Sequence, residues 1–173
     1  MAVTDKEKRM RARWLVVAAG VMVGLVGLGG SVSASPAPSI NGSGTITLPA
    51  EYGDFAGDPV IFQLQAQGGV SASGRFNVVH LDDAGGLYAH VVGDVTCVSV
   101  SEGIAVTTGI IRHAWFRDFP GSQVVDMAVA ITVADRGRSD ALAFDFEFFG
   151  SDIAPCGAIS RFIPIDRGNF TVR

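Results

Sequence analysis

Apolar residues recur at every second position through most of the chain after residue 44, which is the spacing of β-strands and not of helices. In the stretch 60–67, for example, apolar side chains alternate with glutamines, which predicts a strand with one buried and one solvated face. No segment shows a helical apolar stripe with capping residues at its ends. We expect eight strands, over residues 45–48, 60–67, 71–81, 87–100, 104–112, 124–134, 142–148 and 170–172.

The run Leu87–Val100 is the longest strand-like stretch in the chain. At about 3.3 Å per residue it would be roughly 40 Å long, about twice a usual strand, so we expect it to bend. Gly93 is a suitable place for the bend, because a residue without a Cβ tolerates unusual dihedrals. The apolar phase slips after Cys97, which predicts a β-bulge beside that cysteine. Up to the slip, one apolar face comprises Leu87, Ala89, Val91, Val95 and Cys97.

Short turns join most of these strands, and the sequence 82–86 (DDAGG) is a strong hairpin signal. The pattern therefore predicts an all-β fold, an antiparallel meander of about eight strands. We favour a small β-barrel over a two-sheet β-sandwich, because closure removes exposed strand edges. The interior of an eight-stranded barrel is filled by side chains or by one small ligand.

Residues 1–34 have the layout of a secretory signal peptide, with five basic residues, an apolar run over 14–28 and small residues at 32–34. The alternative is a retained membrane anchor, but the run is rich in glycine and shorter than the ~20 residues that span a bilayer comfortably. Residues 35–44 (SPAPSINGSG) resemble a disordered leader. We therefore expect a signal peptide over 1–34, a leader over 35–44 and a single β domain over 45–173.

The charge of the exported part differs from that of the whole chain. Residues 1–34 hold five of the 13 basic and two of the 17 acidic residues. The remainder carries eight arginines, no lysine and 15 acidic residues, a formal net charge of −7. Neutralising phosphates requires local positive charge, so we expect no nucleic-acid binding and no stable membrane association after cleavage.

The chain has two cysteines, Cys97 and Cys156. In an exported chain of this size two cysteines usually form a disulfide. The bridge would enclose about 60 residues and contribute ~4 kcal/mol in the chain-entropy model. Two free thiols or half of a metal site are the alternatives, but neither a CxxC spacing nor a neighbouring histidine supports the metal site.

Several segments together resemble a group of uncharacterised exported bacterial all-β proteins. They are the strand Gly93–Val100 with its Gly-x-Val-Thr-Cys sequence, the following Ile104–Ile110, the late Cys156 and the closing Gly168–Val172. The resemblance implies secretion and a β fold. Its motifs are structural, so it supplies no catalytic residue.

Candidate catalytic and metal-binding residues are few. The three histidines His80, His90 and His113 could in principle hold zinc, but we interpret them as ordinary rim or surface residues. Asp145 and Glu147 would lie roughly 6–7 Å apart on one strand face, a spacing between those of retaining and inverting glycosidases. We interpret them as a solvated face opposite phenylalanines. The sequence thus predicts no catalytic residue, no metal and no cofactor.

The segment 113–121 (HAWFRDFPG) contains three large aromatic residues, Trp115, Phe116 and Phe119. They could form an exposed lip that binds a sugar, a lipid or a protein partner, since binding residues concentrate on loops. Alternatively they fold back over an open end of the core. We favour folding back, and we expect Trp115 to be buried.

These observations lead to a functional expectation. We expect a secreted or periplasmic, non-catalytic β domain that acts by binding an unknown ligand or protein, or as a surface component. The first alternative is a small barrel that carries an apolar ligand, and the second is a barrel enzyme of the isomerase or cyclase type. A cavity would favour the carrier, and a buried polar cluster inside it would favour the enzyme.

Overall fold

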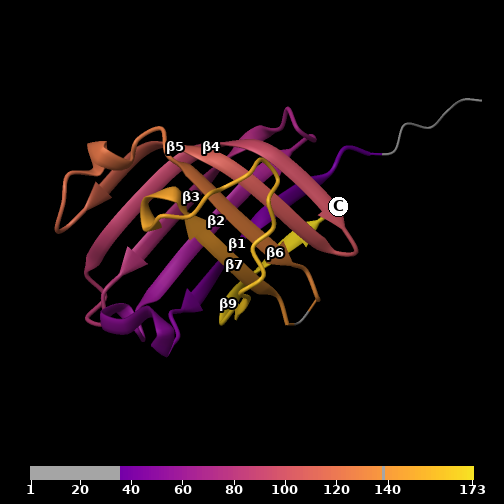
Figure 1. Cartoon of the computed structure of the whole chain (residues 1–173). Helices are drawn as coiled ribbons and strands as arrows, with labels where there is room; N and C mark the ends of the chain where they lie inside the picture. Colours follow the sequence, from indigo (N-terminus) through magenta and orange to yellow (C-terminus); the bar gives the residue numbers. More distant parts are fainter. Residues whose placement is uncertain (1–35, 138) are drawn as a thin grey trace, which may run out of the picture. The chain divides into compact units, whose positions relative to one another are not determined.

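The computed structural model describes residues 36–137 and 139–173, and these residues form nine strands in one antiparallel sheet (Figure 1). The strands are β1 (Ser39–Thr47), β2 (Pro59–Gln67), β3 (Ser73–Leu81), β4 (Leu87–Ser101), β5 (Ile104–Phe116), β6 (Ala128–Ala134), β7 (Ala141–Phe146), β8 (Ile163–Pro164) and β9 (Arg167–Val172). The 3₁₀-helices are η1 (Ala50–Phe55), η2 (Gly121–Val124) and η3 (Glu147–Phe149). Within the described residues, no helix is long and apolar enough to cross a membrane. The predicted signal peptide and its cleavage site lie outside the described residues.

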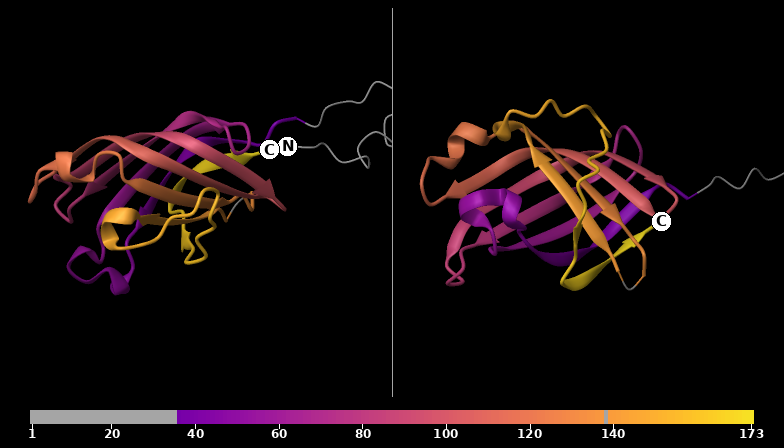
Figure 2. Two further views of the ribbon diagram at one scale, coloured as in Figure 1. Left: turned by 45° about the horizontal axis from the view of Figure 1, so that its top comes forward. Right: turned by 60° about the horizontal axis from the view of Figure 1, so that its bottom comes forward.

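Consecutive strands are neighbours from β1 to β8, and the sheet curls into a barrel-like shape (Figure 2). This confirms the predicted all-β antiparallel meander. The strand that the pattern did not predict is β8, a two-residue strand within the long connection after β7. It was not recognisable because two residues are too few to show an alternation.

The last segment of the chain bridges the two ends of the curled sheet. β8 pairs with β7 at one end and β9 pairs with β1 at the other, with only Ile165 and Asp166 between them. The N–H of Ile165 donates to the carbonyl of Asp140 at 2.9 Å, and the N–H of Asp166 donates to the carbonyl of Thr45 at 2.8 Å. One continuous segment therefore joins the strands at both ends of the sheet.

Two carboxylates complete the pairing of β9 on its free side. Asp140 Oδ2 accepts from the N–H of Phe170 at 3.1 Å, and Asp135 Oδ2 accepts from the N–H of Val172 at 3.2 Å. Both aspartates belong to the connection between β6 and β7, and Asp140 is buried. Side-chain hydrogen bonds thus replace a strand ladder at this place, which satisfies backbone groups that would otherwise lack partners.

β1 begins at Ser39, so the prediction of a disordered leader over 35–44 is wrong from this residue onward. Ile40 is fully buried, and β1 pairs with β2 on one side and β9 on the other. The glycines that made this stretch resemble a linker have a packing role: a Cβ added at Gly44 would lie 2.9 Å from the ring of Phe170. Glycine here allows an aromatic ring of β9 to lie directly on the neighbouring strand.

The long strand β4 contains the predicted irregularities. Its register against β5 shifts between Val92 and Gly93 and again between Val95 and Cys97, which confirms the bulge beside Cys97. The prediction of one apolar face along β4 was only partly correct, because Leu87 is 42% exposed at the end of the strand. Cys97 lies beyond the shift and therefore faces the opposite side from Val95.

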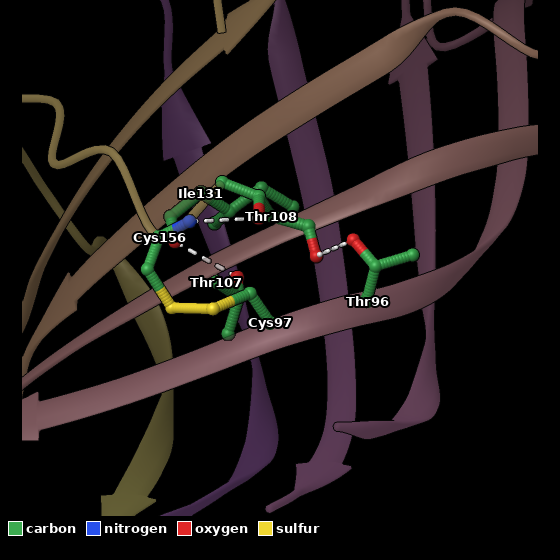
Figure 3. The surroundings of a disulfide bond; sticks show 6 residues. All are labelled: Thr96, Cys97, Thr107, Thr108, Ile131 and Cys156. Atoms are coloured by element: carbon green, nitrogen blue, oxygen red, sulfur yellow. Dashed lines mark hydrogen bonds between the residues drawn. A yellow bond between two sulfur atoms is a disulfide. The ribbon is translucent and has the colours of Figure 1, made fainter. Parts of the chain in front are cut away.

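The predicted disulfide between Cys97 and Cys156 is present, with a Cα–Cα distance of 5.4 Å (Figure 3). Cys97 lies opposite Thr108 of β5, and the hydroxyl of Thr108 accepts from the N–H of Cys156 at 3.1 Å. Further along the same connection, the N–H of Ile159 donates to the hydroxyl of Thr132 at 3.0 Å. The bridge and these two bonds fix the long connection after β7 against the outer face of β5 and β6.

This connection explains why β6 is buried on both faces. Val129, Ile131 and Val133 belong to the core inside the curl. Ala130 and Thr132, which alternate with them, are also fully buried, and Thr132 contacts the connection. The connection after β7 covers the outer face of β6, so this face is not in contact with solvent and does not carry the charged side chains of a solvated sheet face.

Candidate functional site

A cavity of about 450 Å³ opens at one end of the curled sheet. Its lining includes residues near the ends of odd-numbered strands, such as His80 of β3 and Phe116 of β5. It also includes residues near the beginnings of even-numbered strands, such as Val60 of β2 and Tyr88 of β4. In an antiparallel meander these positions lie at the same end of the sheet. The cavity has the size of a small-molecule site, for which about 300–1,000 Å³ is typical.

The three 3₁₀-helices lie at this same end, because η1 follows β1, η2 follows β5 and η3 follows β7. Each contributes side chains to the cavity: Tyr52 and Phe55 from η1, Gln123 from η2, and Phe148 from η3. The short helices therefore form its rim, while the strands form its walls.

Aromatic side chains provide half of the lining. The rings of Phe116 and Phe119 stack with centroids 4.1 Å apart, and those of Phe146 and Phe148 stack at 4.9 Å. Phe116 also meets Phe148 edge to face at 5.7 Å, which connects the two pairs. The aromatic lining residues are Tyr52, Phe55, Tyr88, Phe116, Phe119, Phe144, Phe146, Phe148 and Phe149. Such a wall favours flat or elongated apolar molecules.

The three residues of the predicted lip separate in the structure. Phe116 and Phe119 line the cavity, as expected for side chains that fold back over the open end of the core. Trp115 does not: it is 43% exposed, so the expectation that it is buried is wrong. The physical reason is that β5 continues to Phe116, and side chains alternate along a strand. Trp115 therefore lies on the outer face, opposite His90 of β4.

Replacement of Trp115 with alanine should change the free energy of unfolding by no more than about 0.5 kcal/mol, the usual range for surface positions. Urea denaturation followed by circular dichroism would measure it. The matched control is Phe62→Ala, since Phe62 is fully buried and its truncation should cost about 3–5 kcal/mol. A similar loss in both variants would show that Trp115 packs against the core.

One polar pair lies in the apolar wall. His80 Nε2 and Asp58 Oδ2 are 2.8 Å apart, and the two side chains are only 14% and 8% exposed. The imidazole is flanked by the rings of Phe55, at 5.2 Å, and Tyr88, at 4.9 Å. His80 thus lies at the rim of the sheet, at the end of β3, where its largely buried side chain forms part of the cavity wall.

The other two histidines are separate from this site. His90 Nε2 lies 2.8 Å from Asn77 Oδ1, and His90 pairs with Trp115 on the outer face. His113 is exposed near the end of β5. Among residues 36–137 and 139–173, no group of three potential metal ligands comes together.

Two tyrosines contribute hydroxyl groups to the lining. Burial raises the pKa of Tyr52 above its usual value. Burial also raises the pKa of Tyr88, and the hydrogen bond of 2.8 Å that its hydroxyl donates to Asp118 raises it further. Because an unperturbed tyrosine has a pKa of about 10, both hydroxyls are protonated at neutral pH, and each can donate one hydrogen bond.

Asp145 and Glu147 do not line the cavity. Asp145 accepts a hydrogen bond of 2.6 Å from the hydroxyl of Ser151, and Glu147 accepts one of 2.6 Å from the N–H of Ala128. Both carboxylates therefore hold the chain around η3 in place.

Comparisons with protein-family models, with curated proteins and with solved structures find no match to this chain. The resemblance to exported bacterial all-β proteins accordingly stays a prediction.

Proposed function

We propose that this protein is an exported domain that binds a small, largely apolar molecule in the cavity at the open end of the sheet. The observation that supports this most directly is the cavity of about 450 Å³ with its aromatic walls. Of the functions expected from the sequence, the carrier of an apolar ligand fits this cavity better than a purely structural component does.

The chemistry of the lining supports a ligand with an apolar body and few polar groups. The walls are formed by aromatic and aliphatic side chains, and the polar ones comprise His80, Tyr52, Tyr88 and Gln123. Transfer of an apolar molecule from water into such a site is favoured by about 25 cal/mol for each Å² of apolar surface that is buried. The few polar groups would orient the ligand.

The disulfide supports the export part of the proposal. Structural disulfides form and persist in oxidising compartments, and the Cys97–Cys156 bridge fixes a long connection outside the sheet. An apolar ligand with low solubility in water is a reasonable cargo for a protein in such a compartment.

A neutral apolar dye, N-phenyl-1-naphthylamine, should bind the protein with a saturable rise in fluorescence. Replacing Ala89, a buried residue of the cavity wall, with phenylalanine should weaken this binding at least tenfold, because the larger side chain occupies ligand space. Fluorescence titration measures both affinities, and circular dichroism checks that the variant is folded.

The matched control is Ala84→Phe, which adds the same side chain in the exposed turn between β3 and β4. This variant should bind the dye as the wild type does. Absence of dye binding to the wild type, or equal binding by the folded Ala89→Phe variant, would contradict the proposal. If the dye binds as expected, native mass spectrometry of the protein collected from its secretion medium would identify the natural ligand.

A further inference from the structure

We propose that His80, positioned by Asp58, is a general base that removes a proton from carbon in a molecule bound in the cavity. The inference rests on the proposed function, since the molecule must first bind there. It adds an activity, namely the isomerisation of an apolar carbonyl compound by proton transfer.

The hydrogen bond between His80 and Asp58 determines which imidazole nitrogen is free. An ionised carboxylate only accepts hydrogen bonds, so Nε2 carries the hydrogen in the 2.8 Å contact with Asp58 Oδ2. In the neutral imidazole the other nitrogen, Nδ1, then holds a lone pair. A histidine oriented by a carboxylate in this way is a common general base.

Nδ1 is also accessible. Within the described part of the chain, His80 has a hydrogen bond only through Nε2, and no buried side-chain nitrogen or oxygen lacks a partner. Nδ1 is therefore not buried. His80 lines the cavity together with the flanking rings of Phe55 and Tyr88, and on this ground we assign Nδ1 to the cavity side.

The remaining lining residues limit the type of reaction. Among the described residues around the cavity there is no serine, threonine, cysteine or lysine, so the usual covalent nucleophiles are missing from this wall. Tyr52 of η1 is also a lining residue, and we assign its hydroxyl as the donor to the oxygen of the bound molecule. A base and a donor in an apolar site suit proton transfer next to a carbonyl group.

The step balances without a cofactor. His80 Nδ1 takes the proton from the carbon beside the carbonyl, and the C–H electron pair becomes a carbon–carbon double bond. The carbonyl π pair moves to oxygen, where a hydrogen bond from Tyr52 stabilises the charge, while Asp58 stabilises the imidazolium. The substrate that this requires is a β,γ-unsaturated carbonyl compound. The electron pair on oxygen re-forms the carbonyl group, the new double bond stays between the α and β carbons, and the electrons of the original double bond take the proton from Nδ1 at the γ carbon. Substrate and product therefore have the same composition.

The test uses 5-nitrobenzisoxazole, a flat apolar probe that reacts when a base removes its ring C–H proton. The electron pair of that C–H bond forms a nitrile, the N–O bond breaks, and a coloured phenolate is released. We expect saturable turnover by the wild-type protein and a loss of about 100-fold or more in kcat in His80→Gln, since general bases contribute about 10²–10⁴-fold. The glutamine amide can still donate to Asp58, so this variant removes the base and keeps the wall contact.

Asp58→Asn tests the positioning role. We expect kcat to fall while KM and the affinity for N-phenyl-1-naphthylamine stay unchanged, because a merely structural contact would alter binding or stability instead. Turnover by the wild type that is no faster than that of His80→Gln would overturn the inference. If the dye binds but the probe is not turned over, only the inference fails; if the dye does not bind, the proposed function fails first.

Discussion

Replacement of both Cys97 and Cys156 with serine is expected to lower the free energy of unfolding by about 4 kcal/mol. The bridge joins residues that are 59 positions apart, and such a cross-link restricts the unfolded chain strongly in the chain-entropy model. It also holds the long connection against Thr108 and Thr132, whose hydroxyls accept hydrogen bonds from that connection. Urea denaturation of the two proteins would measure the difference.

The reducing agent dithiothreitol supplies the control for this experiment. Added to the wild type it should reproduce the loss, and added to the double-serine variant it should have no effect. Equal unfolding midpoints for the wild type and the variant would show that the connection stays in place without the bridge.

Truncation of Phe76 to alanine is expected to cost about 3–5 kcal/mol, the usual range for a buried phenylalanine. Phe76 is 1% exposed, and its ring lies on the two glycines where β4 and β5 pass beneath it. A Cβ added at Gly93 would lie 2.3 Å from this ring, and one added at Gly109 would lie 2.9 Å from it. Gly93 and Gly109 have no side chains that could move into the space left by the Phe76 ring, so that space would remain empty in the variant. Thermal or urea unfolding would measure the loss.

Phe149→Ala is the matched control, because the same truncation is made at a side chain that is 65% exposed. Its effect should stay within about 0.5 kcal/mol. A loss below 1 kcal/mol in Phe76→Ala would mean that the two strands close over the vacated space.

Local patterns were sufficient to predict much of the fold. The alternation in residues 60–67 became β2, and the slip after Cys97 became a register shift in β4. These features depend on residues close in sequence, and the period of two is a direct consequence of strand geometry. The disulfide was predictable because the chain contains only two cysteines.

Features that depend on distant segments were not predictable in the same way. The stretch Ser39–Gly44 resembles a linker until Phe170 is placed beside it. The prediction that Trp115 is buried was wrong because the predicted strand ended at residue 112, whereas β5 continues to Phe116. The position of a strand's end decides which of the nearby side chains face outward.

The candidate base was missed for a related reason. Asp58 and His80 are 22 positions apart, and neither lies in a recognisable motif. They meet because Val60 pairs with His80 in the β2–β3 ladder, which places the residues before Val60 beside the end of β3. A register of this kind is known only when both strands have been placed.

The pairing of β1 with β9 has a consequence for how the chain folds during and after synthesis. The first strand of the described domain gains one of its two neighbours only when the last strand has been made and delivered. Contacts between such distant segments cost loop-closure entropy before they give any stabilisation, and they slow folding. Until then one edge of β1 is open to other chains, so newly made protein passes through a stage that is prone to aggregation.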